Sequence, residues 1–222
     1  MTDDDFAAQV AGVSALADPA RRELYRFVAA AGFPVSRDQA AAGVGLPRHT
    51  VKFHLDRLVD DGLLDTEYRR LSGRRGPGAG RPAKLYRRSA REFDVTLPER
   101  HYDLAGEILA EAVDTAVRRR VDVREAVREA AAAHGSRLAT AAGQAPLEDA
   151  LGRLGYEPRA EGDDVALGNC PFHRLAATHT DLVCGMNLDL LTALLDQRGE
   201  ADLRAVLDPA AGRCCVVLHR PD

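Results

Sequence analysis

The last quarter of the chain holds all four cysteines, and two of the seven histidines lie among them. These six residues are Cys170, His173, His179, Cys184, Cys214 and Cys215. Thiolate sulfur and imidazole nitrogen are common ligands of zinc, and thiolates also hold iron–sulfur clusters. The pattern therefore predicts metal or redox chemistry in the C-terminal part of the chain.

Disulfides are the less favoured explanation of these cysteines, because the sequence predicts a soluble, cytoplasmic protein with no membrane partner. The start, MTDDDF, is acidic and lacks the apolar run of a secretory signal, and no later segment approaches the length of a membrane span. Structural disulfides are rare in a reducing compartment. Metal or redox chemistry is therefore favoured over a disulfide framework.

Each possible ligand also has a purely structural explanation. Free cysteine is among the most buried residue types, so a single cysteine is often a core residue. Cys214 and Cys215 are expected on a strand, where neighbours point to opposite faces, so one of them would face a site and the other would pack. His173 has metal-ligand spacing from Cys170, and His179 is a rival. Both zinc and an iron–sulfur cluster remain open.

The charge of the chain is divided unevenly between its two parts. Residues 1–91 carry 16 Lys and Arg against 11 Asp and Glu, whereas residues 92–222 carry 14 against 23. A basic part joined to an acidic part suggests that only the first meets a polyanion. We therefore expect residues 1–91 to bind nucleic acid.

Local signals predict three helices in the basic part. Asp18-Pro19 begins one that runs to Gly32, and the capping box that starts at Ser36 begins a short one that stops at Gly43. A third runs from Pro47 to about residue 61, with apolar residues on one face. Two helices joined by a tight glycine-containing turn predict a helix-turn-helix.

A basic hairpin follows the third helix. Residues 63–71 and 84–88 can form two strands, joined by the loop SGRRGPGAGRPA. Between Arg69 and Arg91 there are nine basic residues and no acidic one. The alternative is a charged loop that is merely solvated, but after a helix-turn-helix the layout favours a DNA-binding wing.

This layout predicts which residues contact double-stranded DNA. The third helix would enter the major groove, and the wing would reach phosphates or the adjacent minor groove. The expected contacts are Arg48, His49, Thr50, Lys52, Phe53 and Arg57 on the helix, and Arg74, Arg75, Arg81 and Lys84 on the wing. Phe53 could equally be a core residue.

Winged-helix modules usually bind palindromic sites as dimers, and a dimerisation segment follows the linker EFDVTLP. Residues 99–119 carry an apolar helical stripe, and a second, Ala-rich helix is expected over residues 123–142. The stripe consists of Leu104, Ile108, Leu109, Ala112, Val113 and Val117. The alternative is that these helices only pack within one chain.

The cysteines are expected to converge from several elements. A strand, DVALGN, would deliver Cys170 at its end, a helix starting at Pro171 would carry Cys184, and a final hairpin would bring in Cys214 and Cys215. A second helix, MNLDLLTALLDQRG, would follow Cys184. The predicted fold class is α+β, with a winged helix-turn-helix at 1–91, a linker and dimerisation helices at 92–143, and a small α+β cysteine-containing domain at 144–222.

Three segments together carry a family resemblance: GRPAKLY on the wing, NCPFHRLAATHTDLVCGMN, and LDPAAGRCCVVL. The chain resembles the SufR family of iron–sulfur-dependent repressors, relatives of the ArsR-like and DeoR-like winged-helix regulators. The resemblance implies a [4Fe-4S] cluster held by Cys170, Cys184 and one of Cys214 or Cys215, in a dimer that represses cluster-assembly genes.

Some members of that family have a further cysteine where this chain has none, between Cys184 and Cys214. The fourth ligand therefore stays open among His173, His179, the second cysteine of the pair and a small exogenous thiol. A structural or sensory zinc site is the alternative. An enzyme using the vicinal cysteines as a dithiol is not expected, because neither a C-x-x-C motif nor a cofactor fingerprint accompanies the pair.

Overall fold

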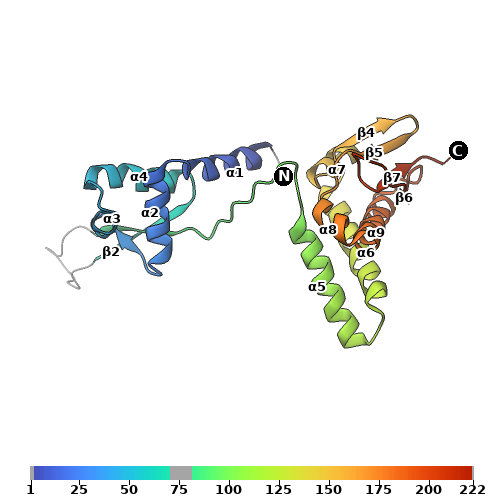
Figure 1. Ribbon diagram of the computed structural model, residues 1–222, viewed down its shortest axis with the longest axis horizontal. Helices are drawn as coiled ribbons and strands as arrows, with labels where there is room; N and C mark the ends of the chain where they lie inside the picture. Colours follow the sequence, from blue (N-terminus) through green and yellow to red (C-terminus); the bar gives the residue numbers. More distant parts are fainter. Residues whose placement is uncertain (1–2, 71–81, 222) are drawn as a thin grey trace. The chain divides into compact units, whose positions relative to one another are not determined.

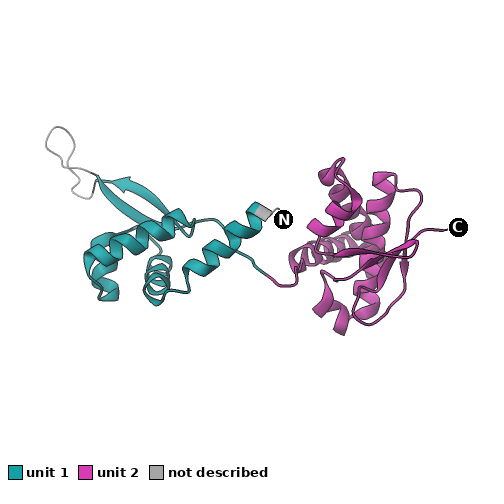
Figure 2. Cartoon of the chain, turned by 90° about the horizontal axis from the view of Figure 1, so that it is seen from above, with its two compact units in different colours: residues 1–95 teal, residues 96–222 magenta. Residues whose placement is uncertain are grey.

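The computed structural model describes residues 3–70 and 82–221 and divides the chain into two units, residues 1–95 and residues 96–222 (Figure 2). Each unit has its own hydrophobic core. The boundary lies inside the segment predicted as a linker, 92–98, so the predicted DNA-binding part is one folding unit.

Unit 1, residues 1–95, contains the predicted helix-turn-helix and hairpin (Figure 1). Its elements are α1 (Asp3–Ala15), α2 (Pro19–Ala30), β1 (Val35–Ser36), α3 (Arg37–Val44), α4 (Arg48–Asp60), β2 (Leu64–Arg69) and β3 (Ala83–Arg88). The three predicted helices correspond to α2, α3 and α4, and the predicted hairpin to β2 and β3. The first helix and the two-residue strand β1 were not predicted.

The N-terminal capping signals act as the sequence suggests, but α3 continues past the predicted stop at Gly43 to Val44. The Asp18 side chain accepts a hydrogen bond from the backbone N–H of Arg21, 2.9 Å away, and Ser36 and Gln39 form a complete capping box at the start of α3. Gly45 ends α3 with a positive φ of 68°, a conformation that glycine adopts without strain. These local interactions set the tight turn between α3 and α4.

Unit 1 buries the apolar faces of its helices against an antiparallel sheet of order β1-β3-β2. The core includes Leu24, Val28, Ala40, Val51, Leu55, Leu58, Leu64 and Tyr86. On α4, Val51, Leu55 and Leu58 recur at helical spacing, so this face is turned inward. The opposite face of α4 is therefore left for solvent or a ligand.

Unit 2, residues 96–222, packs helices against a four-stranded antiparallel sheet of order β4-β5-β7-β6 (Figure 1). Its elements are α5 (Tyr102–Arg119), α6 (Val123–Ala142), α7 (Leu147–Arg153), β4 (Pro158–Glu161), β5 (Asp164–Leu167), α8 (His173–Thr178), α9 (Thr180–Arg198), β6 (Arg204–Leu207) and β7 (Val216–His219). No helix within 3–70 or 82–221 is long and apolar enough to cross a lipid bilayer.

One core joins the two segments that the sequence analysis separates at residue 143. Ile108 of α5 and Ala131 of α6 belong to the same buried cluster as Leu190 of α9 and Val216 of β7. The predicted dimerisation helices and the predicted cysteine-containing domain therefore form a single unit.

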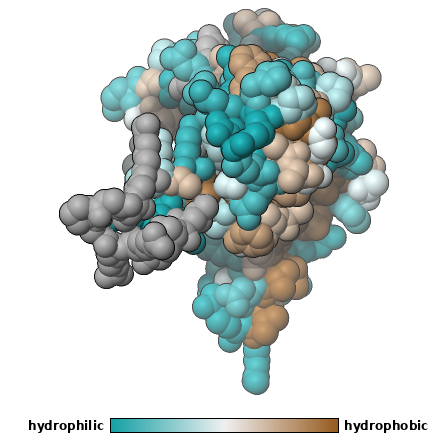
Figure 3. Space-filling model, turned by 90° about the vertical axis from the view of Figure 1, so that its left-hand side faces the viewer, coloured by the Kyte–Doolittle hydropathy of each residue, from teal (hydrophilic) through white to brown (hydrophobic). Residues whose placement is uncertain are grey.

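The apolar stripe of α5 is divided between the core and the surface. Ile108 and Ala112 are fully buried within the chain, whereas Val113 and Val117 remain 54% and 73% exposed. Hydrophobic surface is visible at the lower end of Figure 3, the end at which Figure 1 draws the α5–α6 turn. Leu104 and Leu109 also pack against the core, so packing within one chain accounts for four of the six stripe residues and leaves Val113 and Val117 exposed.

Three local predictions in unit 2 need correction. The helix expected from Pro171 through Cys184 is broken at His179, whose φ and ψ are −131° and 51°. Conversely, α9 continues through Gly185, because Val183 and Met186 both pack into the core and one glycine costs a helix only about 1 kcal/mol. Third, Cys214 and Cys215 lie directly before β7 rather than in it. In addition, no signal in the sequence indicated the short strand β4.

The close approach of α6 and α9 depends on Gly135. A Cβ atom at this position would lie 2.1 Å from the backbone carbonyl oxygen of Leu190. We therefore expect Gly135→Ala to lower the free energy of unfolding by about 2 kcal/mol, within the usual range for an overpacked core. Urea unfolding of the full chain, followed by circular dichroism, measures the change.

Gly106→Ala is the matched control in α5. A Cβ atom at Gly106 would meet nothing within 4 Å. Alanine is the better helix former, so this substitution is expected to raise the free energy of unfolding by about 0.5–1 kcal/mol. Equal stability of the two variants would show that the α6–α9 approach does not require a glycine.

Candidate functional site

The exposed face of α4 carries most of the residues predicted to contact DNA. Arg48, His49, Lys52, Phe53 and Arg57 are exposed, and Thr50 is half-buried. Phe53 is 66% exposed, which excludes the core position left open by the sequence. A helix that follows a tight turn and presents cations and an aromatic ring to solvent can enter a major groove.

Two arginines on this face are held by carboxylates. Arg57 pairs with Asp61 at 2.9 Å, and Arg48 pairs with Asp38 of α3. The hydrogen bond from Arg48 lowers the pKa of the Asp38 carboxyl. Asp38 was not singled out from the sequence, because its contact with Arg48 forms only when α3 and α4 pack together.

Lys84 has a second role, since it ties the wing to α4. Its Nζ lies 2.7 Å from the Asp56 carboxylate, which also accepts a hydrogen bond from the Tyr86 hydroxyl at 3.0 Å. Burial tends to raise the pKa of Asp56, but the hydrogen bonds from Lys84 and Tyr86 outweigh it and keep that pKa below its ordinary value. Burial and the contact with Asp56 raise the pKa of Tyr86. The predicted wing contacts Arg74, Arg75 and Arg81 lie outside the described residues.

Lys84→Met is expected to raise the pKa of Asp56, because the hydrogen bond and charge of Lys84 no longer oppose the effect of burial. At pH values above the ordinary pKa of an aspartate, the ionised Asp56 carboxylate of the wild type stabilises unit 1. This contribution is lost as the pH falls through the lowered pKa of Asp56 in the folded protein. Carboxyl-carbon NMR titration of the full chain measures the pKa of Asp56 directly. Arg87→Met, which removes the exposed pair with Asp65, is the control and should leave Asp56 unchanged. An Asp56 pKa that is the same in wild type and Lys84→Met would contradict the assignment.

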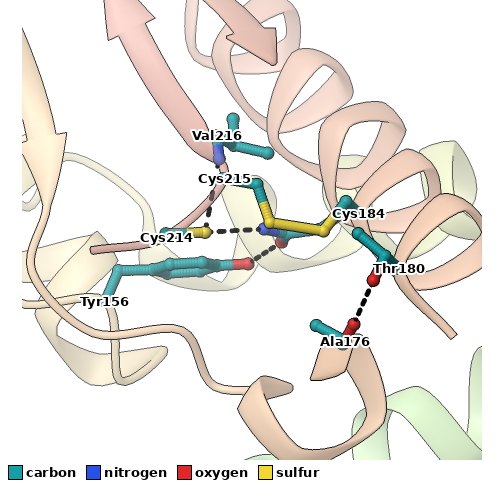
Figure 4. The surroundings of a disulfide bond; sticks show 8 residues. Tyr156, Ala176, Thr180, Cys184, Cys214, Cys215 and Val216 are labelled. Atoms are coloured by element: carbon teal, nitrogen blue, oxygen red, sulfur yellow. Dashed lines mark hydrogen bonds between the residues drawn. A yellow bond between two sulfur atoms is a disulfide. The ribbon is translucent and has the colours of Figure 1, made fainter. Parts of the chain in front are cut away.

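In unit 2, all four cysteines gather where β5, α9 and the start of β7 meet. Cys170 follows β5, Cys184 lies in the second turn of α9, and Cys214 and Cys215 directly precede β7. Figure 4 shows a disulfide between Cys184 and Cys215, whose Cα atoms are 6.4 Å apart. This disulfide differs from the sequence-based expectation of metal or redox chemistry, whereas the convergence of these elements was expected.

The other two cysteines, Cys170 and Cys214, are buried free thiols in contact with each other. The Cys214 thiol donates a hydrogen bond to the Cys170 sulfur. This bond lowers the pKa of Cys170 against the opposing effect of burial, and the Phe172 N–H and the Arg100 guanidinium add to the lowering. The same bond, together with burial, raises the pKa of Cys214.

A buried polar chain leads to the Cys214 sulfur. The Tyr156 hydroxyl donates to Oδ1 of Asn187, and Nδ2 of Asn187 lies 3.3 Å from the Cys214 sulfur (Figure 4). Both side chains are about 1% exposed. A tyrosine hydroxyl that donates to the amide oxygen directs the amide nitrogen toward the sulfur. No local signal marked Tyr156 or Asn187, since they meet only when α9 packs beside the loop after α7.

The two histidines do not share the surroundings of the cysteines. His173 begins α8 and His179 precedes α9, and both side chains are exposed. Cys170, Cys184 and Cys214 are buried, and Cys215 is half-buried. The structure thus brings together the four predicted sulfur ligands and leaves His173 and His179 at the surface.

The chemistry of the donor set fits a thiolate-bound group. In the described part of the chain no three His, Cys, Asp or Glu side chains are arranged as ligands of one metal ion, and two of the four sulfurs are joined. The sulfurs instead form two pairs, Cys184 with Cys215 in the disulfide and Cys170 with Cys214 through a hydrogen bond, and the adjacent residues 214 and 215 bring the two pairs to the same end of β7. Reduction of the disulfide would expose four soft sulfur ligands, which suit an iron–sulfur cluster or zinc.

Comparison with known proteins supports a DNA-binding role for the exposed face of α4 in unit 1. Residues 16–67 match the sequence profile of a helix-turn-helix domain family. No curated protein and no solved structure matches the chain significantly. The matched segment runs from the end of α1 to within β2 and includes the exposed face of α4. The match, the wing hairpin and the cationic face together support a winged-helix, DNA-binding transcriptional regulator.

Proposed function

We propose that the chain is a transcriptional repressor whose affinity for its operator is controlled by a [4Fe-4S] cluster at the four-cysteine site. The observation that carries this proposal is the gathering of four sulfurs in the same chain as a helix-turn-helix. Because the chain resembles the SufR-like regulators, we expect it to act in the cytoplasm and to repress genes of iron–sulfur cluster assembly.

On the DNA side, α4 supplies the contacts. His49, Lys52 and Phe53 point into solvent from the same face, and Arg48 is oriented by Asp38. The wing strand is held against this helix by the Lys84–Asp56 pair. Lys52 and Arg48 would meet phosphates, and His49 would reach base edges in the major groove.

On the cysteine side, the chain would supply Cys170, Cys184 and Cys215 as ligands, with Cys214 as the fourth. Ligation would first require a small cellular thiol to reduce the Cys184–Cys215 disulfide by two electrons and to leave as its own disulfide, so the loaded and the disulfide forms exclude each other. When bound, the cluster would supply a redox-sensitive group, and its loss would lower the affinity of the protein for the operator. Asn187 would hold the Cys214 sulfur in place by its N–H donation, and Tyr156 would hold Asn187.

The repressor is proposed to act as a homodimer on a palindromic operator. The support is the apolar surface that α5 leaves exposed, Val113 and Val117, together with Val123 at the start of α6. A twofold dimer doubles the DNA contacts and matches two half-sites about one helical turn apart. Sedimentation of the loaded protein at micromolar concentration measures the oligomeric state.

Zinc is the alternative occupant of the same four sulfurs. A closed set of four cysteine ligands is typical of structural zinc sites. In that case the sulfur site would stabilise unit 2, and another signal would control DNA binding. The version of this alternative that uses His173 has less support, because that side chain is exposed.

The experiment is an ultraviolet–visible spectrum of protein purified without oxygen, with iron, acid-labile sulfide and zinc assayed on the same sample. We expect a brown protein with a broad absorption band at about 400 nm and with about four iron and four sulfide ions per chain. A colourless protein with one zinc would favour the alternative. A colourless, metal-free protein with an intact Cys184–Cys215 disulfide would overturn both.

A further inference from the structure

The segment that joins the two units is hydrogen-bonded directly to the backbone of the first cysteine. Unit 2 begins at Thr96, and Nη1 of Arg100 donates to the backbone carbonyl oxygen of Cys170 at 2.8 Å. The same nitrogen donates to Oδ1 of Asn169. Arg100, two residues after the linker 92–98, therefore contacts two successive residues of the cysteine loop.

Asn169 also donates hydrogen bonds back to the segment that contains Arg100. Its Nδ2 donates to the carbonyl oxygen of Glu99 at 2.9 Å and to that of Gly155 at 2.6 Å. Asn169 is only 7% exposed, so all of its side-chain contacts are made within the protein. A buried amide with every contact satisfied holds its neighbours in a single arrangement.

Two further contacts continue along the linker. The backbone N–H of His101 donates to the carbonyl oxygen of Pro171 at 3.2 Å, and the backbone N–H of Arg174 lies 3.4 Å from the Tyr102 hydroxyl. Each of residues 99–102 thus contacts the loop 169–174. We name residues 99–102 and 169–174 the linker junction.

We propose that the linker junction transmits the state of the four-cysteine site to the chain segment that enters the DNA-binding unit, with Arg100 and Asn169 as the positioning residues. This inference rests on the proposed function. Cys170 has its sulfur in the site and its carbonyl oxygen in the junction, so a change of sulfur partner moves both. The two states of the cysteine loop would hold residues 99–102 differently, which biases the DNA-binding unit at its point of attachment.

The test compares the ratio of DNA dissociation constants between cluster-loaded and cluster-free protein. In the wild type we expect a ratio of at least ~10, which corresponds to about 1.4 kcal/mol of coupling. In samples matched for iron and sulfide content, Arg100→Ala and Asn169→Ala are expected to bring this ratio to within about twofold of one. Arg100→Lys, which keeps a donor for the Cys170 carbonyl, should recover part of the ratio.

Arg198→Ala is the matched control. Arg198 is another largely buried arginine of unit 2 that donates to backbone carbonyl oxygens, those of Gly143 and Ala145. It does not belong to the linker junction, so its removal is expected to lower stability without changing the ratio. If Arg100→Ala and Asn169→Ala keep the wild-type ratio, or if Arg198→Ala loses it equally, the junction does not transmit the signal.

A second readout separates this inference from the proposed function. Tryptic cleavage after the exposed Arg91, identified by mass spectrometry, reports on the linker without DNA. We expect the cleavage rate to differ between loaded and cluster-free wild type and to become equal in Arg100→Ala. A wild-type cleavage difference that depends on Arg100, with no difference in DNA affinity, would leave the junction standing and overturn the proposed function. Equal cleavage in both wild-type forms would overturn the junction.

Discussion

Removing two cations from the exposed face of α4 is expected to weaken DNA binding about 100-fold at ~100 mM salt. In the double variant Arg48→Ala/Lys52→Ala, each lost contact is assigned about 1.4 kcal/mol, the equivalent of a tenfold change. The slope of the logarithm of affinity against the logarithm of salt concentration should fall by about two. Fluorescence anisotropy on an operator selected from a random duplex library measures both.

The control for this variant removes exposed arginines from unit 2. Arg159→Ala/Arg220→Ala deletes the same amount of charge from surface pairs with Glu157 and Asp202. It is expected to change affinity less than about threefold, since only nonspecific attraction is altered. Equal losses in the two double variants would show that net charge, rather than the face of α4, determines binding.

Cys184→Ser is expected to abolish the cluster and to reduce the operator affinity of anaerobically purified protein at least ~10-fold. The serine hydroxyl is a poor substitute for thiolate, and Cys215 loses its disulfide partner as well. Iron and sulfide assays, followed by anisotropy on the same sample, measure the two effects. Cys215→Ser should behave in the same way, because both sulfurs belong to the proposed ligand set.

His173→Ala and His179→Ala are the matched controls, because both histidines lie near the cysteines in sequence but are exposed in the structure. Each variant is expected to retain wild-type iron, sulfide and affinity. Loss of the cluster in either one would show that a histidine, rather than Cys214, is the fourth ligand.

The sequence predicts the DNA-binding unit well, because its structure depends on local signals. The aspartate cap at Asp18, the capping box at Ser36 and the apolar face of α4 each act within a few residues. β1 was missed because a two-residue strand has no periodicity of its own and exists only by pairing with β3. The ion pair of Arg48 with Asp38 likewise depends on the packing of α3 against α4.

The cysteine site was predicted only in part. The elements that deliver Cys170, Cys184 and the 214–215 pair could be expected from turn residues and β-branched content, and their convergence was expected from the order of those elements. The pairing of Cys184 with Cys215, and the chain from Tyr156 to Asn187 to Cys214, join residues 27 to 31 positions apart, in elements that must first fold. No spacing rule carries that information.

The dimerisation stripe shows the limit of periodicity in another way. A stripe reports that one face of α5 is apolar, but it does not specify the partner. The structure assigns Ile108 and Ala112 to packing within the chain and leaves Val113 and Val117 exposed. An Ala-rich partner helix such as α6 covers a narrower face than the full stripe, since its side chains are short.

The most direct test is a pair of binding isotherms for one sample of full-length protein on the selected operator, at one fixed salt concentration, before and after removal of the cluster. The proposed function predicts that the dissociation constant rises at least ~10-fold when the cluster is removed and returns when it is rebuilt. Superimposable isotherms would contradict control by the four-cysteine site and leave a winged-helix DNA-binding protein whose signal lies elsewhere.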